Sequence, residues 1–141
     1  MNLLRKSFLI PKCISKIKNW PVALLYYLGN KNEEKEITLK DGTKCIMRNK
    51  SDAVAFFENF ILEVNELEKI VEIEQNDVVI DIGAHVGYFT LYAAKKAQNG
   101  KVISFEPTKE SFLVLKNNVK INDFQNIIIN NLAVAEISKK R

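Results

Sequence analysis

Short apolar runs alternate with segments of helical spacing along the second half of the chain. The runs are a few residues long, whereas the segments between them place apolar residues three or four positions apart. The order strand, helix, strand, helix, strand predicts a parallel sheet with right-handed crossovers. The second strand lacks strict alternation, so we expect both faces of the sheet to be covered. The predicted strands are 78–82, 101–106 and 126–130, and the predicted helices are 88–97 and a segment that opens at Pro107-Thr108.

A β-hairpin and a helix are predicted ahead of this sheet. Strand-like runs at 36–40 and 43–47 flank Asp41-Gly42, a dipeptide preferred in two-residue hairpin turns. Ser51 offers a helix N-cap, and the apolar residues that follow approximate one helical face, which predicts a helix over residues 52–72. The chain therefore divides into three predicted parts: a basic and apolar N-terminal segment at 1–35, a hairpin-plus-helix lead-in at 36–76 and the α/β sheet region at 77–141.

The composition is that of one ordinary globular domain. The chain has 141 residues, of which 47% are hydrophobic and 27% are charged. The net charge of +4 is too small to indicate a nucleic-acid partner, and we expect none. The positive charge belongs to the N-terminal segment, where six basic residues and no acid precede Glu33. We expect a helix there that packs on the domain, with docking on an anionic membrane surface as the alternative.

Cysteine and histidine usage narrows the chemistry. Cys13 and Cys45 show neither metal-ligand nor C-x-x-C spacing, so we expect two reduced thiols and a cytoplasmic protein. No apolar run approaches the roughly 20 residues of a membrane-spanning helix. His85 is the only histidine, which argues against a histidine zinc site and against a Ser-His-Asp triad with a separate histidine. We therefore expect no metal and no transmembrane segment.

The stretch 78–89 carries the candidate ligand site. An apolar strand ends near Asp81, the chain turns through Gly83 and Gly87, and a helix follows. Such turns bind nucleotide-like ligands because the strand end and the helix N-terminus both present free backbone groups. The glycines let the backbone pass close to a ligand. Glu106 ends the second strand, about 20 residues beyond the loop, at the position that hydrogen-bonds ribose hydroxyls.

A dinucleotide is the competing ligand for this loop. Its fingerprint, G-x-G-x-x-G, needs a middle glycine beside the pyrophosphate. This chain has Gly83-x-x-x-Gly87, with Ala84 and His85 at the point of closest approach. A ligand without a pyrophosphate fits better, and S-adenosylmethionine offers an adenosine for Glu106 and a zwitterionic methionine end for the loop. A dinucleotide-binding oxidoreductase is therefore the less favoured alternative.

Three motifs carry a family resemblance. Residues 81–87 match D-x-G-A-x-x-G, residues 105–107 match F-E-P and residues 131–133 match N-x-A. Over roughly residues 37–136 the chain resembles class I S-adenosylmethionine-dependent methyltransferases of the FkbM type. The resemblance implies a Rossmann-like sheet, of which strands one to three and their crossover helices are present. Because the sheet of this class has seven strands, it also implies that only the cofactor-binding half is present, with a complementing C-terminal half as a candidate partner.

The resemblance also implies roles for individual residues. Asp81 and the loop backbone would face the methionine part of the cofactor, and Glu106 would bind the ribose. Pro107, Asn131 and Leu132 would lie by the adenine. The structural alternatives are Asp81 as a cap of the turn, Glu106 as a solvated strand end and Asn131 as a turn residue. His85 is expected to cap the helix or pack by the cofactor rather than act as a base. The implied cofactor-binding residues are Asp81, Gly83, Ala84, His85, Gly87, Glu106, Pro107, Asn131 and Leu132.

The activity that the resemblance implies is methyl transfer from S-adenosylmethionine to a hydroxyl of a sugar, glycan or secondary metabolite. The sulfonium makes the methyl group electrophilic, so the main contribution of the protein is to position donor and acceptor. The alternative from another class is a catalytically inert cofactor-binding remnant, or one part of a split assembly. No residue of the sequence selects the acceptor, and no catalytic residue is assigned.

Overall fold

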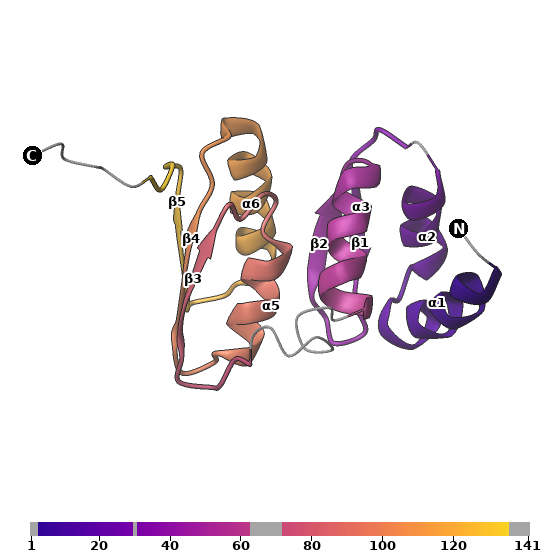
Figure 1. Ribbon diagram of the computed structural model, residues 1–141, viewed down its shortest axis with the longest axis horizontal. Helices are drawn as coiled ribbons and strands as arrows, with labels where there is room; N and C mark the ends of the chain where they lie inside the picture. The colour runs from indigo at the N-terminus through magenta and orange to yellow at the C-terminus, as the bar shows by residue number, and fades with distance from the viewer. Residues whose placement is uncertain (1–2, 30, 63–71, 136–141) are drawn as a thin grey trace, which may run out of the picture. The chain divides into compact units, whose positions relative to one another are not determined.

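The computed structural model describes residues 3–29, 31–62 and 72–135. The chain forms two compact units, Met1–Glu72 with Lys120–Asp123 and Ile73–Val119 with Phe124–Arg141 (Figure 1). The elements of the first unit are α1 (Leu3–Lys16), α2 (Trp20–Leu28), β1 (Lys35–Thr38), β2 (Lys44–Met47), α3 (Lys50–Phe56) and the π-helix η1 (Phe57–Leu62). Those that begin in the second are β3 (Val78–Ile82), α5 (Tyr88–Lys96), β4 (Lys101–Phe105), α6 (Lys109–Asn122) and β5 (Ile127–Asn130).

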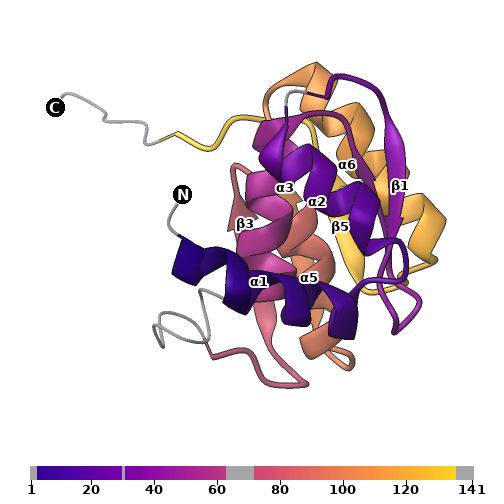
Figure 2. The same ribbon diagram turned by 90° about the vertical axis from the view of Figure 1, so that its right-hand side faces the viewer.

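The first unit packs its helices around an aromatic core. Helix α2 contacts α1, α3 and strand β1 (Figure 2). The ring of Tyr27 stacks on Phe57 with 4.4 Å between ring centroids. The helix expected in the basic segment is present as α1, and Cys13 of this helix and Ile17 just after it are fully buried. None of the helices in the described part of the chain has the length and apolar character needed to span a bilayer.

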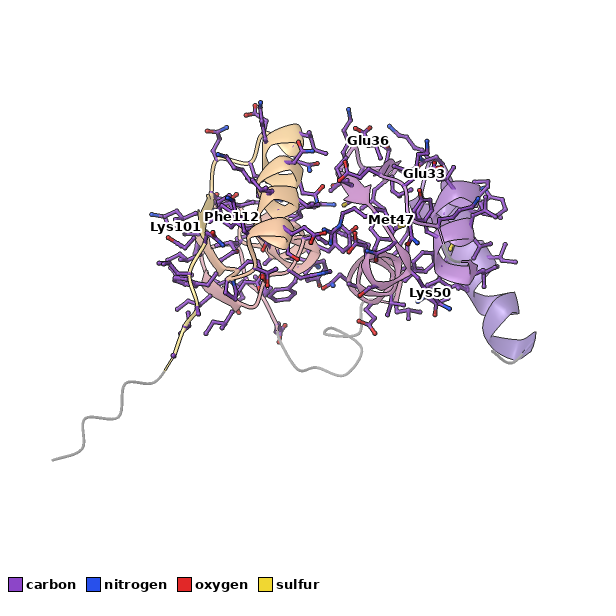
Figure 3. All side chains as sticks on the ribbon, turned by 90° about the horizontal axis from the view of Figure 1, so that it is seen from above. Glu33, Glu36, Met47, Lys50, Lys101 and Phe112 are labelled. Carbon is purple, nitrogen blue, oxygen red and sulfur yellow. The ribbon has the colours of Figure 1, made fainter. Side chains whose placement is uncertain are left out.

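The predicted hairpin is confirmed, but its turn is longer than expected. Strands β1 and β2 pair antiparallel, with fully buried Met47 on the core side and Glu36 exposed (Figure 3). The Leu39 N–H donates to the Thr43 carbonyl, so the loop has three residues rather than two. Among the turn residues Gly42 alone has a positive φ, of 95°. The Asp41 carboxylate instead accepts the Thr43 N–H at 2.9 Å, which fixes the turn through its side chain.

The predicted helix after the hairpin begins two residues earlier than expected. Asn49, not Ser51, is the N-cap of α3, and its side-chain oxygen accepts the Asp52 N–H at 3.0 Å. The helix passes into the π-helical segment η1, which buries Phe57 and Ile61. The predicted continuation over 63–71 lies outside the described residues.

The second unit contains the predicted parallel sheet. Its strand order is β3-β4-β5, with β3 and β5 both paired parallel to β4. The predicted bounds of the first strand are confirmed, and those of the other two differ by one residue. Helices α5 and α6 lie on the same side of the sheet (Figure 1). Buried Ala93 and Ala94 of α5 pack against Val102 of β4, which forms the core of this layer.

The expectation that both faces of the sheet are covered was wrong for the described residues. Val78, Ile80 and Ile82 are 66%, 61% and 63% exposed on the face of β3 opposite the helices. Each new strand is added on the same side of the previous one, so the right-handed crossovers place both helices on one face. Covering the other face would require the strand order to reverse. One layer of helices and one open apolar face are the result.

Candidate functional site

The loop between β3 and α5 is held against the carboxyl end of β4. The N–H groups of Gly83 and Ala84 both donate to the Phe105 carbonyl, at 2.9 and 3.0 Å. Positive φ angles occur at Gly83 (81°), His85 (51°) and Gly87 (88°). The N-cap of α5 is Gly87, whereas the sequence had offered His85 as a cap of that helix. The sequence therefore folds into a tight turn whose backbone lies at the edge where the strands end.

The two glycines of this loop serve different purposes. A Cβ at Gly83 would meet nothing within 4 Å, so the backbone is open there to a ligand. A Cβ at Gly87 would overlap the side chain of Leu115, which is fully buried in α6. The side-chain amide of Asn118, also in α6, donates to the Val86 carbonyl at 2.8 Å. Gly87 is thus required for packing of the loop against α6, whereas Gly83 faces open space.

Glu106 joins the loop to the start of α6. The residue is only 6% exposed, so Glu106 is not the solvated strand end that was the structural alternative. One oxygen, Oε2, accepts the His85 N–H and the other, Oε1, accepts the Thr108 N–H, both at 2.8 Å. Burial raises the pKa of this carboxyl. The backbone hydrogen bonds from Thr108 and His85, together with the Thr108 side chain and the charge of His85, outweigh burial and lower the pKa below its ordinary value. Glu106 is therefore held as an anion.

Asp81 is buried beneath the loop. Its Oδ2 accepts the Thr90 hydroxyl at 2.6 Å, and the oxygen of that hydroxyl lies 2.9 Å from the Ser104 hydroxyl. Burial raises the pKa of Asp81, the Thr90 hydrogen bond lowers it in part, and the charge of Glu106 raises it further. The acid is bonded to α5 and is not a cap of the turn. Sequence reasoning missed Thr90 and Ser104, although a parallel register that pairs Asp81 with Ser104 would have suggested the second.

An apolar pocket lies beside Glu106 at the ends of the strands. It has a volume of about 150 Å³ and includes Gly83 of the loop in its lining. The Asn131 amide donates to the carbonyls of Glu106 (2.7 Å) and Pro107 (3.1 Å), which ties the chain after β5 to the end of β4. Asn131 thus supports the wall of the pocket and does not line it. The lining residues are Ile82, Gly83, Phe105, Pro107, Leu132, Ala133 and Val134.

Sequence comparison decides the family of this chain. The profile of the TRM5/TYW2 methyltransferase domain matches residues 40–140. The chain belongs to the TRM5/TYW2 methyltransferase domain family. The resemblance to class I methyltransferases is confirmed at the level of the class, whereas the narrower FkbM assignment stays a prediction.

Relatives of this TRM5/TYW2-family chain include other methyltransferases. Ribosomal RNA small subunit methyltransferase A of Staphylococcus haemolyticus is 32% identical over 116 residues, which cover 76% of this chain and 37% of that protein. Methyltransferase sdnD of Sordaria araneosa is 35% identical over 54 residues, or 38% of this chain and 21% of that protein. The chain therefore spans between about a fifth and two fifths of the length of these relatives.

Solved structures show the same fold. TYW2 of P. horikoshii in complex with MeSAdo matches with a TM-score of 0.53 and 21% identity, covering 74% of this chain and 38% of that one. TYW2 of M. jannaschii in complex with AdoMet matches with a TM-score of 0.50 and 24% identity, covering 72% and 43%. The TRM5/TYW2-family chain thus has the Rossmann-like α/β fold expected from its sequence.

Proposed function

We propose that this chain binds S-adenosylmethionine at the loop after β3 and forms the cofactor-binding part of a methyltransferase. The observation that carries the proposal is the arrangement at the ends of the strands. Two buried carboxylates, Asp81 and Glu106, flank a backbone that is open at Gly83, and an apolar pocket adjoins them. The family and the AdoMet and MeSAdo complexes of TYW2 support the same cofactor.

The residues present fit the adenosine part of this cofactor. Each oxygen of the Glu106 carboxylate accepts one backbone N–H, and a carboxylate has about four acceptor sites, so it keeps acceptor capacity for the ribose hydroxyls. The apolar pocket, with Pro107 and Leu132 in its lining, suits the faces of an adenine. Asn131 holds that wall through backbone carbonyls.

The methionine part is assigned to Asp81 and to the loop backbone of Gly83, Ala84 and His85. Asp81 offers negative charge to the ammonium group. When bound, the cofactor supplies a methyl group made electrophilic by a sulfonium. The residues of this chain bind and orient it, and positioning is the main source of rate in such a transfer. None of the described residues is proposed as a base.

The proposed acceptor is RNA, with a hydroxyl on a sugar or metabolite as the second candidate. The ribosomal RNA methyltransferases among the relatives support RNA, and the six basic residues that precede Glu33 supply charge for phosphate contacts. The expectation of no nucleic-acid partner rested on the net charge of the whole chain, which averages this segment with the rest. The F-E-P and N-x-A motifs at 105–107 and 131–133 favour the second candidate.

Calorimetry with S-adenosylhomocysteine tests the cofactor assignment. We expect saturable heat from the chain, and we expect Glu106→Ala to weaken binding by about 1–3 kcal/mol through lost charged hydrogen bonds. Glu74→Ala, at an exposed acid of the same unit, is the control and should bind as the wild type does. No heat at millimolar ligand would remove the proposal. Binding without methyl transfer to any acceptor would favour the inert remnant, and saturable NADH fluorescence enhancement would favour the oxidoreductase.

Fluorescence anisotropy with a short labelled RNA tests the acceptor class. The double variant Lys18→Glu/Lys31→Glu changes two exposed residues of the basic segment and should weaken binding and flatten its salt dependence. The double variant Lys101→Glu/Lys116→Glu, at two exposed lysines of the second unit, is the matched control and should change binding less. RNA binding that neither variant alters, together with label transfer from S-adenosylmethionine to a small-molecule fraction, would favour the hydroxyl acceptor.

The open apolar face of the sheet is where the complementing half expected from the sequence would pack. Val78, Ile80 and Ile82 of β3, with Ile128 of β5, are exposed large hydrophobic residues on this sheet. Contiguous apolar surface of this kind marks an interaction site in soluble proteins. Addition of a polypeptide that completes the sheet should suppress the fluorescence of a hydrophobic dye bound to the chain. Replacing Ile80 with Lys should lower the dye signal without that addition.

A further inference from the structure

A buried chain of hydrogen bonds runs from Asp81 through Thr90 to Ser104. The three side chains come from β3, α5 and β4 and are 8%, 0% and 0% exposed. Thr90 Oγ1 lies 2.6 Å from Asp81 Oδ2 and 2.9 Å from Ser104 Oγ. Polar groups so deeply buried destabilise the fold unless they are paired, and here each of the three has a partner.

The direction of these hydrogen bonds follows from the number of protons. A threonine hydroxyl has one proton, and Thr90 donates it to the Asp81 carboxylate. The Thr90 oxygen is then left as an acceptor, so Ser104 is the donor of the second bond. Both bonds therefore point toward the carboxylate. They fix its position from the helix side and from the neighbouring strand, where Ser104 is the register partner of Asp81.

The chain of hydroxyls occupies only one carboxylate oxygen. Among residues 3–29, 31–62 and 72–135, Thr90 is the residue that donates a hydrogen bond to the Asp81 side chain, and it donates to Oδ2. Oδ1 accepts no hydrogen bond from these residues. One oxygen is thus anchored and the other is available to a ligand. Glu106 is the charged group that acts on Asp81, and its repulsion favours a cationic ligand there.

We propose that Thr90 and Ser104 are positioning residues for the cofactor: they hold Asp81 by one oxygen and leave the other to accept the ammonium group of its methionine end. The inference rests on the proposed function, because it takes S-adenosylmethionine as the ligand of this loop. It goes beyond that function in assigning the orientation of the Asp81 carboxylate to two hydroxyls that lie outside the loop.

Two ligands that differ only in the amino-acid end test the proposal. S-Adenosylhomocysteine carries that end, and methylthioadenosine lacks it. Thr90→Val keeps the side-chain shape but removes the donor, and should weaken S-adenosylhomocysteine binding about tenfold while leaving methylthioadenosine binding unchanged. Thr90→Ser restores the hydroxyl and should recover most of the affinity. A merely structural role would weaken both ligands alike, and that result, or no change for either, would overturn the inference.

Ser104→Ala provides a second, independent variant. It should weaken S-adenosylhomocysteine binding less than Thr90→Val does, because Thr90 still donates to Asp81. In the Thr90→Val background it should have no further effect, since Ser104 acts through Thr90. Additive losses in the double variant would contradict the proposed order of the hydrogen bonds. If Thr90→Val does not fold, the ligand selectivity of Ser104→Ala decides the question.

A titration of the ligand-free chain separates this inference from the proposed function. Carboxyl carbon NMR follows the pKa of Asp81 directly, and loss of the Thr90 hydrogen bond in Thr90→Val should raise that pKa. Thr90→Ser should return it toward the wild-type value. An unchanged pKa in Thr90→Val overturns the positioning role even if the wild type binds the cofactor. Absence of binding by the wild type overturns the proposed function and the ligand assignment with it.

Discussion

Replacing Glu106 with glutamine tests whether its carboxylate organises the loop before any cofactor binds. In the wild type its two oxygens accept the N–H groups of His85 and Thr108, each at 2.8 Å. A glutamine amide has one acceptor oxygen, so one of these N–H groups would face an NH₂ group instead. Leaving a donor unpaired at a site that is 6% exposed costs about 1–3 kcal/mol, and the free energy of unfolding at pH 7 should fall by that amount.

The pH dependence of this loss has a definite sign. The pKa of Glu106 is lower in the folded chain than its ordinary value of 4.5. Its contribution to stability is therefore fully present above that ordinary value and is lost as the pH falls through the lowered pKa. Once protonated, the Glu106 carboxyl carries a donor, as the glutamine amide does. The difference in unfolding free energy between wild type and Glu106→Gln should then shrink toward zero.

Urea unfolding followed by circular dichroism, at pH 7 and at steps down through the acid range, measures this difference. Glu74→Gln is the matched control, because Glu74 is an exposed acid of the same unit, and it should lie within about 0.5 kcal/mol of the wild type throughout. The role given to Glu106 would be refuted by equal stabilities at pH 7. It would also be refuted by a loss that persists unchanged below the pKa of the wild-type carboxyl.

Four other substitutions should give results that the same structure explains. Gly87→Ala should lower the free energy of unfolding by about 2–4 kcal/mol, because alanine at this position overlaps Leu115 and is strained in the left-handed backbone conformation. Gly83→Ala should cost only the backbone strain, about 1–2 kcal/mol. Equal losses in urea unfolding would contradict this difference. The pKa of Asp81 is raised in the folded chain, so the contribution of this acid to stability is lost as the pH rises through that pKa. Asp81→Asn should therefore stabilise the chain at pH 7. It should also weaken S-adenosylhomocysteine binding in calorimetry. Asn131→Ala removes two hydrogen bonds that hold the pocket wall and should weaken adenosine binding with little change in unfolding free energy; an unchanged affinity would reject that support role.

Local patterns in the sequence identified most of the second unit. The strands at 78–82 and near 101–106 and 126–130 were placed within one residue, because apolar runs bounded by turn residues carry their own signal. The loop glycines and Glu106 were found in the same way, since spacing along the chain reports the end of a strand and the start of a helix. The family, by contrast, followed from comparison with other proteins.

Errors arose where the outcome depends on competition between neighbouring residues. Ser51 and Asn49 can each cap a helix. In the structure Asn49 accepts the Asp52 N–H, and the Asp52 side chain forms an ion pair with Arg48 at 2.8 Å. Asp41-Gly42 suits a two-residue turn, yet the Asp41 side chain binds Thr43 N–H and the loop takes three residues. Propensities rank such alternatives but do not decide between options that differ by a fraction of a kcal/mol.

The amino-acid pattern alone predicts the order of elements, the turn at the end of β3 and the presence of two acids at neighbouring strand ends. The hydrogen bonds that each acid makes depend on how the elements pack. Glu106 binds two backbone N–H groups, and Asp81 is anchored by Thr90 of α5, which in turn is bonded to Ser104 of β4. These contacts join residues that are distant in the chain. They depend on strand register and helix packing, which no local pattern specifies.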